Sequence, residues 1–192
     1  KITEAMLAYF IDRTVGKNRF FKPEVMICVP TGCTQVERRA VMDATLSAGA
    51  KVVYLIEEPL ASAIGAKIPI AQASGHMIVD IGGGSTEAAV ISLGGVVVHK
   101  SARVAGNKID EAIAQFVKKT YNLMIGERMS ETIKMTIGTA VEDEPRTIEV
   151  RGRDAVSGLP RMITLTSREV VTAIMPVLNQ IIGCVKSALQ DT

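Results

Sequence analysis

Residues 80–87 read DIGGGSTE and separate two short apolar runs, residues 77–81 and 87–92. Both runs have the composition of buried strands, so the glycines connect a strand to a strand. A Walker A loop or a Rossmann turn leads instead from a strand into a helix, which excludes both motifs. Three glycines let the backbone approach a bound group closely and direct successive N–H groups at it, which suits a chain of phosphates. The alternative is an ordinary hairpin turn made flexible by glycine.

The polar side chains of this stretch favour the phosphate interpretation. Asp80 ends the preceding strand, where its carboxylate can hold a Mg²⁺ ion through water, because this ion keeps much of its hydration shell. Ser85 and Thr86 follow the glycines and add hydroxyl donors.

A second acidic position lies upstream, where residues 55–59 read LIEEP. Glu58 ends a predicted buried strand and begins a helix whose first turn accommodates Pro59, and cleft residues collect at such strand ends. Phosphoryl transfer to water needs a group that orients the attacking water, and Glu58 is our candidate. A solvated acid favoured by the helix dipole is the alternative for Glu58 and the preferred interpretation for Glu57. Glu58-Pro59 and the later glycine stretch together form a more specific signal than either alone.

The N-terminal part of the chain predicts a βαβ unit. Residues 24–29 and 52–56 are apolar runs typical of buried strands, and Thr34 with Glu37 forms a capping box at the start of a helix between them. Two strands joined through a helix are expected to be parallel. A helix over residues 2–15 precedes this unit. We predict a first lobe over residues 1–74, which ends in a connector rich in Gly, Pro and Ala.

A second lobe is predicted over residues 75–192. Its expected elements are strands at 77–81, 87–92 and 96–103, helices at 107–120 and 127–137, and a long terminal helix. Residues 139–166 resemble a small inserted subdomain with two strands, 147–150 and 162–165. A capping box at residues 166–169 starts the terminal helix, which we expect to be interrupted near Pro176.

Composition limits the function classes. The 192 residues are 47% apolar and 22% charged, with a net charge of +2 and 4% aromatic residues. Scattered basic residues and few aromatics argue against a nucleic-acid partner. The three cysteines have no CxxC spacing and the two histidines stand apart, so neither a zinc site nor a disulfide framework is predicted. The most apolar stretch, residues 170–185, is shorter than the roughly 18–20 residues of a spanning helix, which predicts a soluble cytoplasmic protein.

Four segments make the chain resemble a known family. They are VPTGCTQVERRAV at 29–41, LIEEPLASAIGA at 55–66, VDIGGGSTEAAVISLGG at 79–95 and GERMSETIK at 126–134. Across nearly its whole length the chain is similar to the bacterial MreB family of rod shape-determining proteins. The resemblance implies an α/β, actin-like (ribonuclease H-like) ATPase fold, shared with Hsp70 and the sugar kinases, in which ATP and Mg²⁺ lie between two lobes.

The resemblance also implies roles for individual residues at the phosphates. Residues 80–86 match the second phosphate loop, which would assign nucleotide contacts to Asp80, Gly82, Gly83, Gly84, Ser85 and Thr86 and a water-mediated Mg²⁺ contact to Asp80. Glu58 matches the water-orienting glutamate. Ser85 stands where a catalytic threonine is usual and keeps the hydroxyl.

Further matches concern the rest of the nucleotide. Gly106 matches a backbone turn beside the phosphates, and Glu131 and Lys134 match residues that contact ribose and adenine. The i, i+3 spacing puts Glu131 and Lys134 on one helix face, where a surface ion pair is the alternative. Asn107 stands where the family usually has Asp, and we assign it no role. The first phosphate loop and the last adenine-binding turn of the family would lie outside residues 1–192, so we expect this fragment to bind ATP poorly and to be inactive alone.

Two surface features have competing interpretations. Phe20-Phe21 is flanked by cationic residues, and it could enter an anionic membrane surface or fold back onto the first helix. The resemblance favours the membrane. Val36 could mark the contact between paired protofilaments, as in the family, or the edge of the core.

The expected function of the intact protein follows from the resemblance. It is a weak Mg²⁺-dependent ATPase and the subunit of a membrane-associated filament at the inner face of the cell membrane, which organises the cell-wall elongation machinery and sets rod shape. The alternatives are an Hsp70-like or sugar-kinase-like ATPase domain of the same fold and a non-catalytic interaction module.

Overall fold

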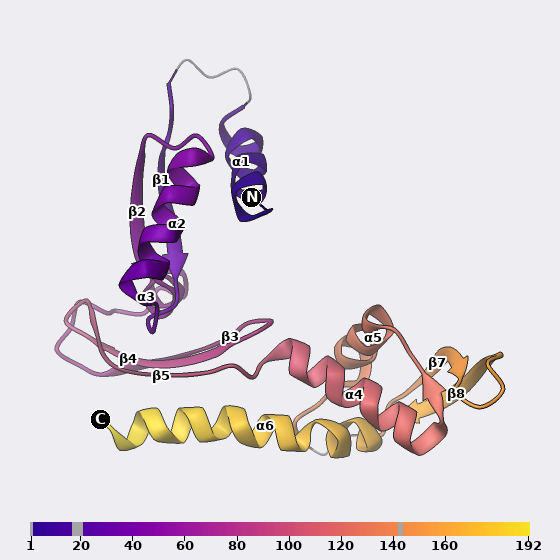
Figure 1. Cartoon of the computed structure of the whole chain (residues 1–192). Coiled ribbons are helices and arrows are strands. Elements are labelled where there is room, and N and C mark those ends of the chain that lie inside the picture. The colour runs from indigo at the N-terminus through magenta and orange to yellow at the C-terminus, as the bar shows by residue number, and fades with distance from the viewer. Residues whose placement is uncertain (1, 17–20, 142–143) are drawn as a thin grey trace. The chain divides into compact units, whose positions relative to one another are not determined.

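The computed structural model describes every residue except 1, 17–20 and 142–143. The chain forms two compact units (Figure 1): residues 1–80 with 89–99, and residues 81–88 with 100–192. The division crosses a three-stranded sheet, whose strands contribute to both units. The lobe boundary at residue 74 and the inserted subdomain stay predictions.

The first unit contains the predicted parallel βαβ motif. Its elements are α1 (Ile2–Val15), β1 (Glu24–Val29), α2 (Gln35–Ser47), β2 (Val52–Glu57) and α3 (Glu58–Gly65). Strands β1 and β2 pair in parallel, which confirms the prediction, and their carboxyl ends meet at the pair Val29↔Glu57. Thr34 caps α2 through the predicted capping box with Glu37. Pro59 lies in the first turn of α3, where its missing N–H costs no helical hydrogen bond.

A three-stranded sheet carries the glycine stretch. Its strands are β3 (His76–Ile81), β4 (Thr86–Ser92) and β5 (Gly95–Ala102), in the order β3-β4-β5. The N–H of Gly82 donates to the carbonyl of Ser85 at 3.0 Å and closes a tight turn between β3 and β4. The glycines therefore join strand to strand, as the sequence predicted.

The remaining elements of the second unit surround one apolar core. They are α4 (Gly106–Tyr121), β6 (Leu123–Met124), α5 (Glu127–Ile137), β7 (Thr147–Asp154), β8 (Pro160–Thr166) and α6 (Ser167–Gln190). The antiparallel sheet β6-β7-β8 packs its buried face on the helices. Fully buried core side chains come from α4, α5, the sheet and α6: Ile113, Val117, Leu123, Ile133, Ile137, Val150, Leu165 and Val170.

Helix α6 differs from its prediction in two ways. It is continuous from Ser167 to Gln190, so the expected interruption near Pro176 is wrong. By length and hydropathy it could also cross a membrane, which the shorter stretch 170–185 did not suggest. Its seven buried residues recur every three or four positions from Ser167 to Ala188, the pattern of an amphipathic core helix. Packing along this face keeps the helix intact despite the hydrogen bond that proline removes.

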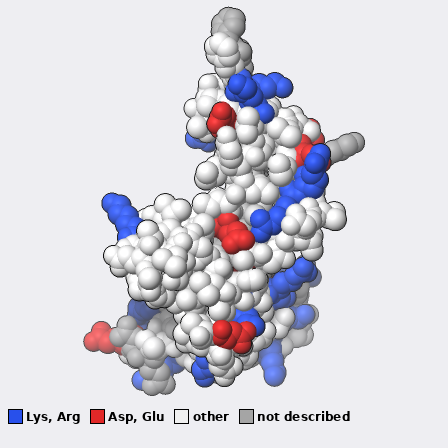
Figure 2. Space-filling view, turned by 90° about the vertical axis from the view of Figure 1, so that its left-hand side faces the viewer, with Lys and Arg blue, Asp and Glu red and all other residues white. Residues whose placement is uncertain are grey.

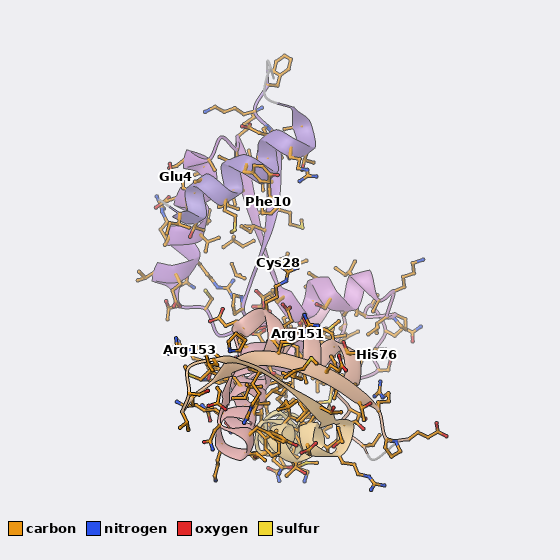
Figure 3. The ribbon with its side chains drawn as sticks, turned by 90° about the vertical axis from the view of Figure 1, so that its right-hand side faces the viewer. Glu4, Phe10, Cys28, His76, Arg151 and Arg153 are labelled. Atoms are coloured by element: carbon orange, nitrogen blue, oxygen red, sulfur yellow. The ribbon has the colours of Figure 1, made fainter. Side chains whose placement is uncertain are left out.

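Charged groups are dispersed on the face drawn in Figure 2, where basic side chains are interspersed with acidic and uncharged ones. Arg151 and Arg153 are exposed and two residues apart on β7 (Figure 3), so they share one face of the strand. Cys28 on β1 is an exposed free thiol, and His76 begins β3. Among the described residues, no cluster of three or more His, Cys, Asp or Glu side chains could hold a metal ion.

Candidate functional site

Asp80 is bonded to the helix that carries Glu58, within the first unit. Ser62 Oγ, on α3, donates a hydrogen bond of 2.6 Å to Oδ2 of Asp80 at the end of β3. Ser62 follows Glu58 by four residues on the same helix, so the two side chains share one face. Asp80 and Glu58 are both half-buried. The face of α3 that carries Glu58 is therefore the face that contacts Asp80.

The neighbours of Glu58 have structural contacts. Glu57 forms an ion pair with Arg38 at 3.1 Å, which ties α2 to the end of β2. Cys33 lies in the loop before α2, and burial, followed by the charge of Glu37 and more weakly that of Glu58, raises the pKa of its thiol. The thiol is therefore neutral near pH 7, which makes it a poor nucleophile.

The glycine turn of the second unit is attached to the start of α4. The N–H of Gly106 donates to the carbonyl of Gly82 at 3.1 Å, and that of Asn107 donates to the carbonyl of Gly83 at 2.8 Å. A Cβ atom at Gly106 would lie 3.3 Å from the Gly82 carbonyl oxygen, closer than most Cβ contacts, so a larger residue would require the turn to shift by a few tenths of an ångström. The exposed turn thus lies at the positive end of a helix dipole, which favours an anion.

The two hydroxyl residues after the glycines differ in exposure. Thr86 is fully buried, and its hydroxyl donates to the Val104 carbonyl at 2.6 Å. Thr86 therefore fixes the end of the glycine turn on its buried side, through this bond to Val104. Ser85 is half-buried and lies in the turn itself, so its hydroxyl is the more accessible of the two.

A pocket of about 690 Å³ lies next to the start of α4. Helices α4 and α5 and the residues just before α5 line it, with Asn107, Asp110, Glu111, Ala114, Ile125, Glu127, Arg128, Ser130 and Glu131. Glu131 therefore faces a cavity large enough for a small-molecule ligand.

Lys134 binds residues at the edge of this pocket. Its Nζ donates to Asp110 Oδ2 at 2.7 Å and approaches the Gly106 carbonyl at 3.4 Å. The other oxygen of Asp110 is buried and has no hydrogen-bond partner among the described residues. Lys134 thus connects α5 to the point where α4 meets the glycine turn.

Sequence reasoning missed Asn107 and Asp110. Residues 107, 110, 111 and 114 all line the pocket and follow the i, i+3, i+4, i+7 pattern of one helix face. The polar residues at this spacing are the sequence signal that marks this face of the helix.

The two surface positions are exposed. Phe21 is 88% exposed and Val36 is 79% exposed. Phe20 lies outside the described residues.

The described residues offer few candidate ligands for a Mg²⁺ ion. Asp80 supplies one half-buried carboxylate beside the glycine turn, and the described residues offer no cluster that could form an all-protein cage. Oxygen is the ligand that Mg²⁺ prefers, and the ion is commonly held by one or two carboxylates together with water and substrate phosphates. The residues present fit that mode of binding.

The family model of the MreB/Mbl protein matches residues 1–192, the whole chain. This chain belongs to the MreB/Mbl family. The cell shape-determining protein MreB of Pasteurella multocida is 50% identical over 99% of this chain and 55% of its own length, and that of Escherichia coli is equally similar. The cell shape-determining protein Mbl of Bacillus subtilis is 46% identical over 100% of this chain and 58% of its own length. This MreB/Mbl chain therefore spans about half the length of these curated relatives.

Solved structures support the MreB/Mbl assignment. MreB5 of Spiroplasma citri bound to ADP has a TM-score of 0.92 and 34% identity over 98% of this chain and 57% of its own. The AMPPNP-bound form of MreB5 has the same TM-score. The MamK double helical filament has a TM-score of 0.79 at 18% identity over 98% of this chain and 56% of its own, which shows the fold alone. The predicted α/β actin-like fold of the MreB family is confirmed.

Proposed function

We propose that the full-length protein is the subunit of an ATP-dependent, actin-like filament that determines rod cell shape by organising cell-wall synthesis. The observation that carries this proposal is the TM-score of 0.92 to a nucleotide-bound MreB5 over 98% of the chain. The names of the relatives as cell shape-determining proteins support the cellular role. They give no support to an Hsp70-like or sugar-kinase-like ATPase.

The second unit would contribute nucleotide contacts. Backbone N–H groups of Gly83 and Gly84, with the Ser85 hydroxyl, bind phosphate at the positive end of α4. The N–H of Gly82 is bonded to the Ser85 carbonyl, so Gly82 contributes by closing the turn that presents these donors. Gly106 lets this turn approach the helix without the tight contact that a Cβ atom would make with the Gly82 carbonyl oxygen. Thr86 stabilises the turn through the hydrogen bond from its hydroxyl to the Val104 carbonyl.

The pocket beside the turn would take the nucleoside. Glu131 lines it, and Lys134 lies at its edge beside Gly106. A ribose hydroxyl can donate to a carboxylate such as Glu131, because ionised carboxylates accept strong hydrogen bonds. The volume of about 690 Å³ lies within the range of small-molecule sites.

The first unit would contribute the groups that act on hydrolysis. Glu58 orients the attacking water by accepting its hydrogen bond, and Asp80 holds hydrated Mg²⁺. When bound, Mg²⁺ neutralises charge that develops on the transferring phosphoryl group. The hydrogen bond from Ser62 to Asp80 supports this scheme, because it brings Asp80 to the helix face that carries Glu58.

Glu58→Ala in the full-length protein tests this assignment. We expect phosphate release to slow about 100-fold, since a positioned proton acceptor contributes on that scale, while ATP still drives the protein into a pellet of filaments visible by electron microscopy. Glu57→Ala is the matched control, because Glu57 is paired with Arg38. Failure of the wild-type protein to pellet with ATP would contradict the filament proposal, and an unchanged rate in Glu58→Ala would contradict the role of Glu58.

Self-association through Val36, membrane contact through Phe20 and Phe21, and a position at the inner face of the cell membrane are further parts of this proposal. Their support is exposure: Val36 and Phe21 are large apolar side chains that stand in solvent on the first unit. Isolated apolar residues at a surface are common, so each needs its own test.

A further inference from the structure

The hydroxyl of Ser62 has a different hydrogen-bond acceptor from most helical hydroxyls of this structure. Ser and Thr within helices commonly bond back to the carbonyl four residues earlier. Among the described residues seven helical hydroxyls do so: Thr14, Thr45, Ser130, Thr132, Thr136, Thr172 and Ser187. Ser62 instead donates across to Asp80 Oδ2 at 2.6 Å. A hydroxyl bound to a carboxylate forms a charge-assisted hydrogen bond, roughly twice as strong as a neutral one.

The helix that carries Ser62 is well anchored. Pro59 and Ala63 of α3 are buried, Ala63 completely. Pro59 restricts the backbone of the first turn, where Glu58 lies. Ser62 therefore contacts Asp80 from a helix that is held in place by its buried residues. Glu58 lies one helical turn away on the same face.

We propose that Ser62 is a positioning residue for Asp80, an inference that rests on the proposed function. The hydrogen bond holds one carboxylate oxygen and so restricts rotation of the group. The second oxygen would then be oriented to accept a hydrogen bond from a water molecule bound to Mg²⁺. The same bond joins Asp80 to the helix that carries Glu58. It therefore limits movement of the Asp80 carboxylate relative to that helix. Outer-shell hydrogen bonds act in this way on metal-binding carboxylates in general.

The test compares ATP affinity in Mg²⁺ with ATP affinity in EDTA, by titration calorimetry on the full-length protein. The gain in affinity that Mg²⁺ provides is the measured quantity. We expect Ser62→Ala to reduce this gain about tenfold, at the lower end of outer-shell effects, and to leave affinity in EDTA unchanged. Ser62→Thr retains a hydroxyl and keeps the gain. Ser187→Ala, which removes a hydroxyl bound to its own helix on α6, is the matched control.

The remaining outcomes separate this inference from the proposed function. If Asp80→Asn abolishes the Mg²⁺ gain and Ser62→Ala retains it in full, the role of Ser62 is contradicted and the proposed function stands. If Ser62→Ala lowers affinity equally in Mg²⁺ and EDTA, its role is general support of the fold, and the inference is again overturned. If wild type shows no Mg²⁺ gain, or Asp80→Asn retains it, the proposed role of Asp80 fails together with that of Ser62.

Discussion

Gly106 is a single residue on which the geometry of the glycine turn depends. A Cβ atom there would meet the Gly82 carbonyl at 3.3 Å and Lys134 Nζ at 3.5 Å. The first distance is tighter than most Cβ contacts, so Gly106→Ala should shift the turn from α4 by a few tenths of an ångström, whereas the second is an ordinary van der Waals contact. We expect ATP affinity of the full-length protein to fall about tenfold, because small misplacements of binding groups are costly. Titration calorimetry gives the affinity, and a urea unfolding curve shows whether stability has changed.

Gly183 is the matched control for that substitution. It lies in α6, which contributes no residue to the pocket, and a Cβ atom would meet nothing within 4 Å. Gly183→Ala should therefore leave ATP affinity unchanged. Equal losses in the two variants would mean that the spacing at Gly106 is irrelevant to the nucleotide.

Residue-level prediction succeeded where backbone chemistry is local. The capping boxes of Thr34 and Thr166 form as predicted, because their hydrogen bonds join residues three apart in sequence. The ion pair between Lys134 and Asp110 joins residues 24 apart, and no local pattern reports such a distance. The hydrogen bond of Ser62 to Asp80 was missed for the same reason.

At the scale of elements, helix α5 positions the pocket by burying one face and exposing the other. Ile133 is 0% exposed in the core of the second unit, whereas Met135, two residues later, is 77% exposed. Ile133→Ala should lower the free energy of unfolding by about 2–5 kcal/mol through lost burial and a cavity. Met135→Ala should change it by less than about 0.5 kcal/mol. Urea unfolding of the full-length protein measures both, and similar effects would contradict the packing described for α5.

Element prediction failed where packing outweighs local propensity. Pro176 breaks an isolated helix, but α6 continues through it because its buried face runs from Val170 to Ala188. The strands β7 and β8 are longer than predicted, at Thr147–Asp154 and Pro160–Thr166, because they pair with one another along seven residues each. A local sequence pattern does not report which strand pairs with another or which residues form the core, because both depend on residues far apart in the chain.

At the scale of the whole molecule, the fold was predictable because the diagnostic segments are spread over the whole sequence. The strand-end acids, the glycine turn and the start of α5 come from residues 55–66, 79–95 and 126–134. Each is a local motif with a defined chemical requirement, and their order along the chain identified the family. The combination of side chains that line the pocket could not be predicted in the same way, since Asn107 and Glu131 face one cavity only after α4 and α5 pack together.

The proposed position of the intact protein at a membrane depends on the exposed end of the loop after α1. Phe21 is 88% exposed and Lys22 beside it is also exposed, so an aromatic ring and a cation are available to an anionic lipid surface. Phe21→Ser should reduce binding of the full-length protein to anionic vesicles about tenfold, the order expected from burial of one large apolar side chain. Vesicle sedimentation measures the bound fraction.

Val156→Ser provides the comparison for Phe21, because Val156 is 85% exposed in the connection between β7 and β8 of the second unit. If the Phe21 ring enters the lipid, vesicle binding falls in Phe21→Ser and not in Val156→Ser. If binding depends only on total surface hydrophobicity, it falls in both variants. The double variant Phe20→Ser, Phe21→Ser should lose more than the single one, since each buried ring adds apolar area to the contact. Full binding by the double variant would remove this loop from the membrane contact and require another surface for it.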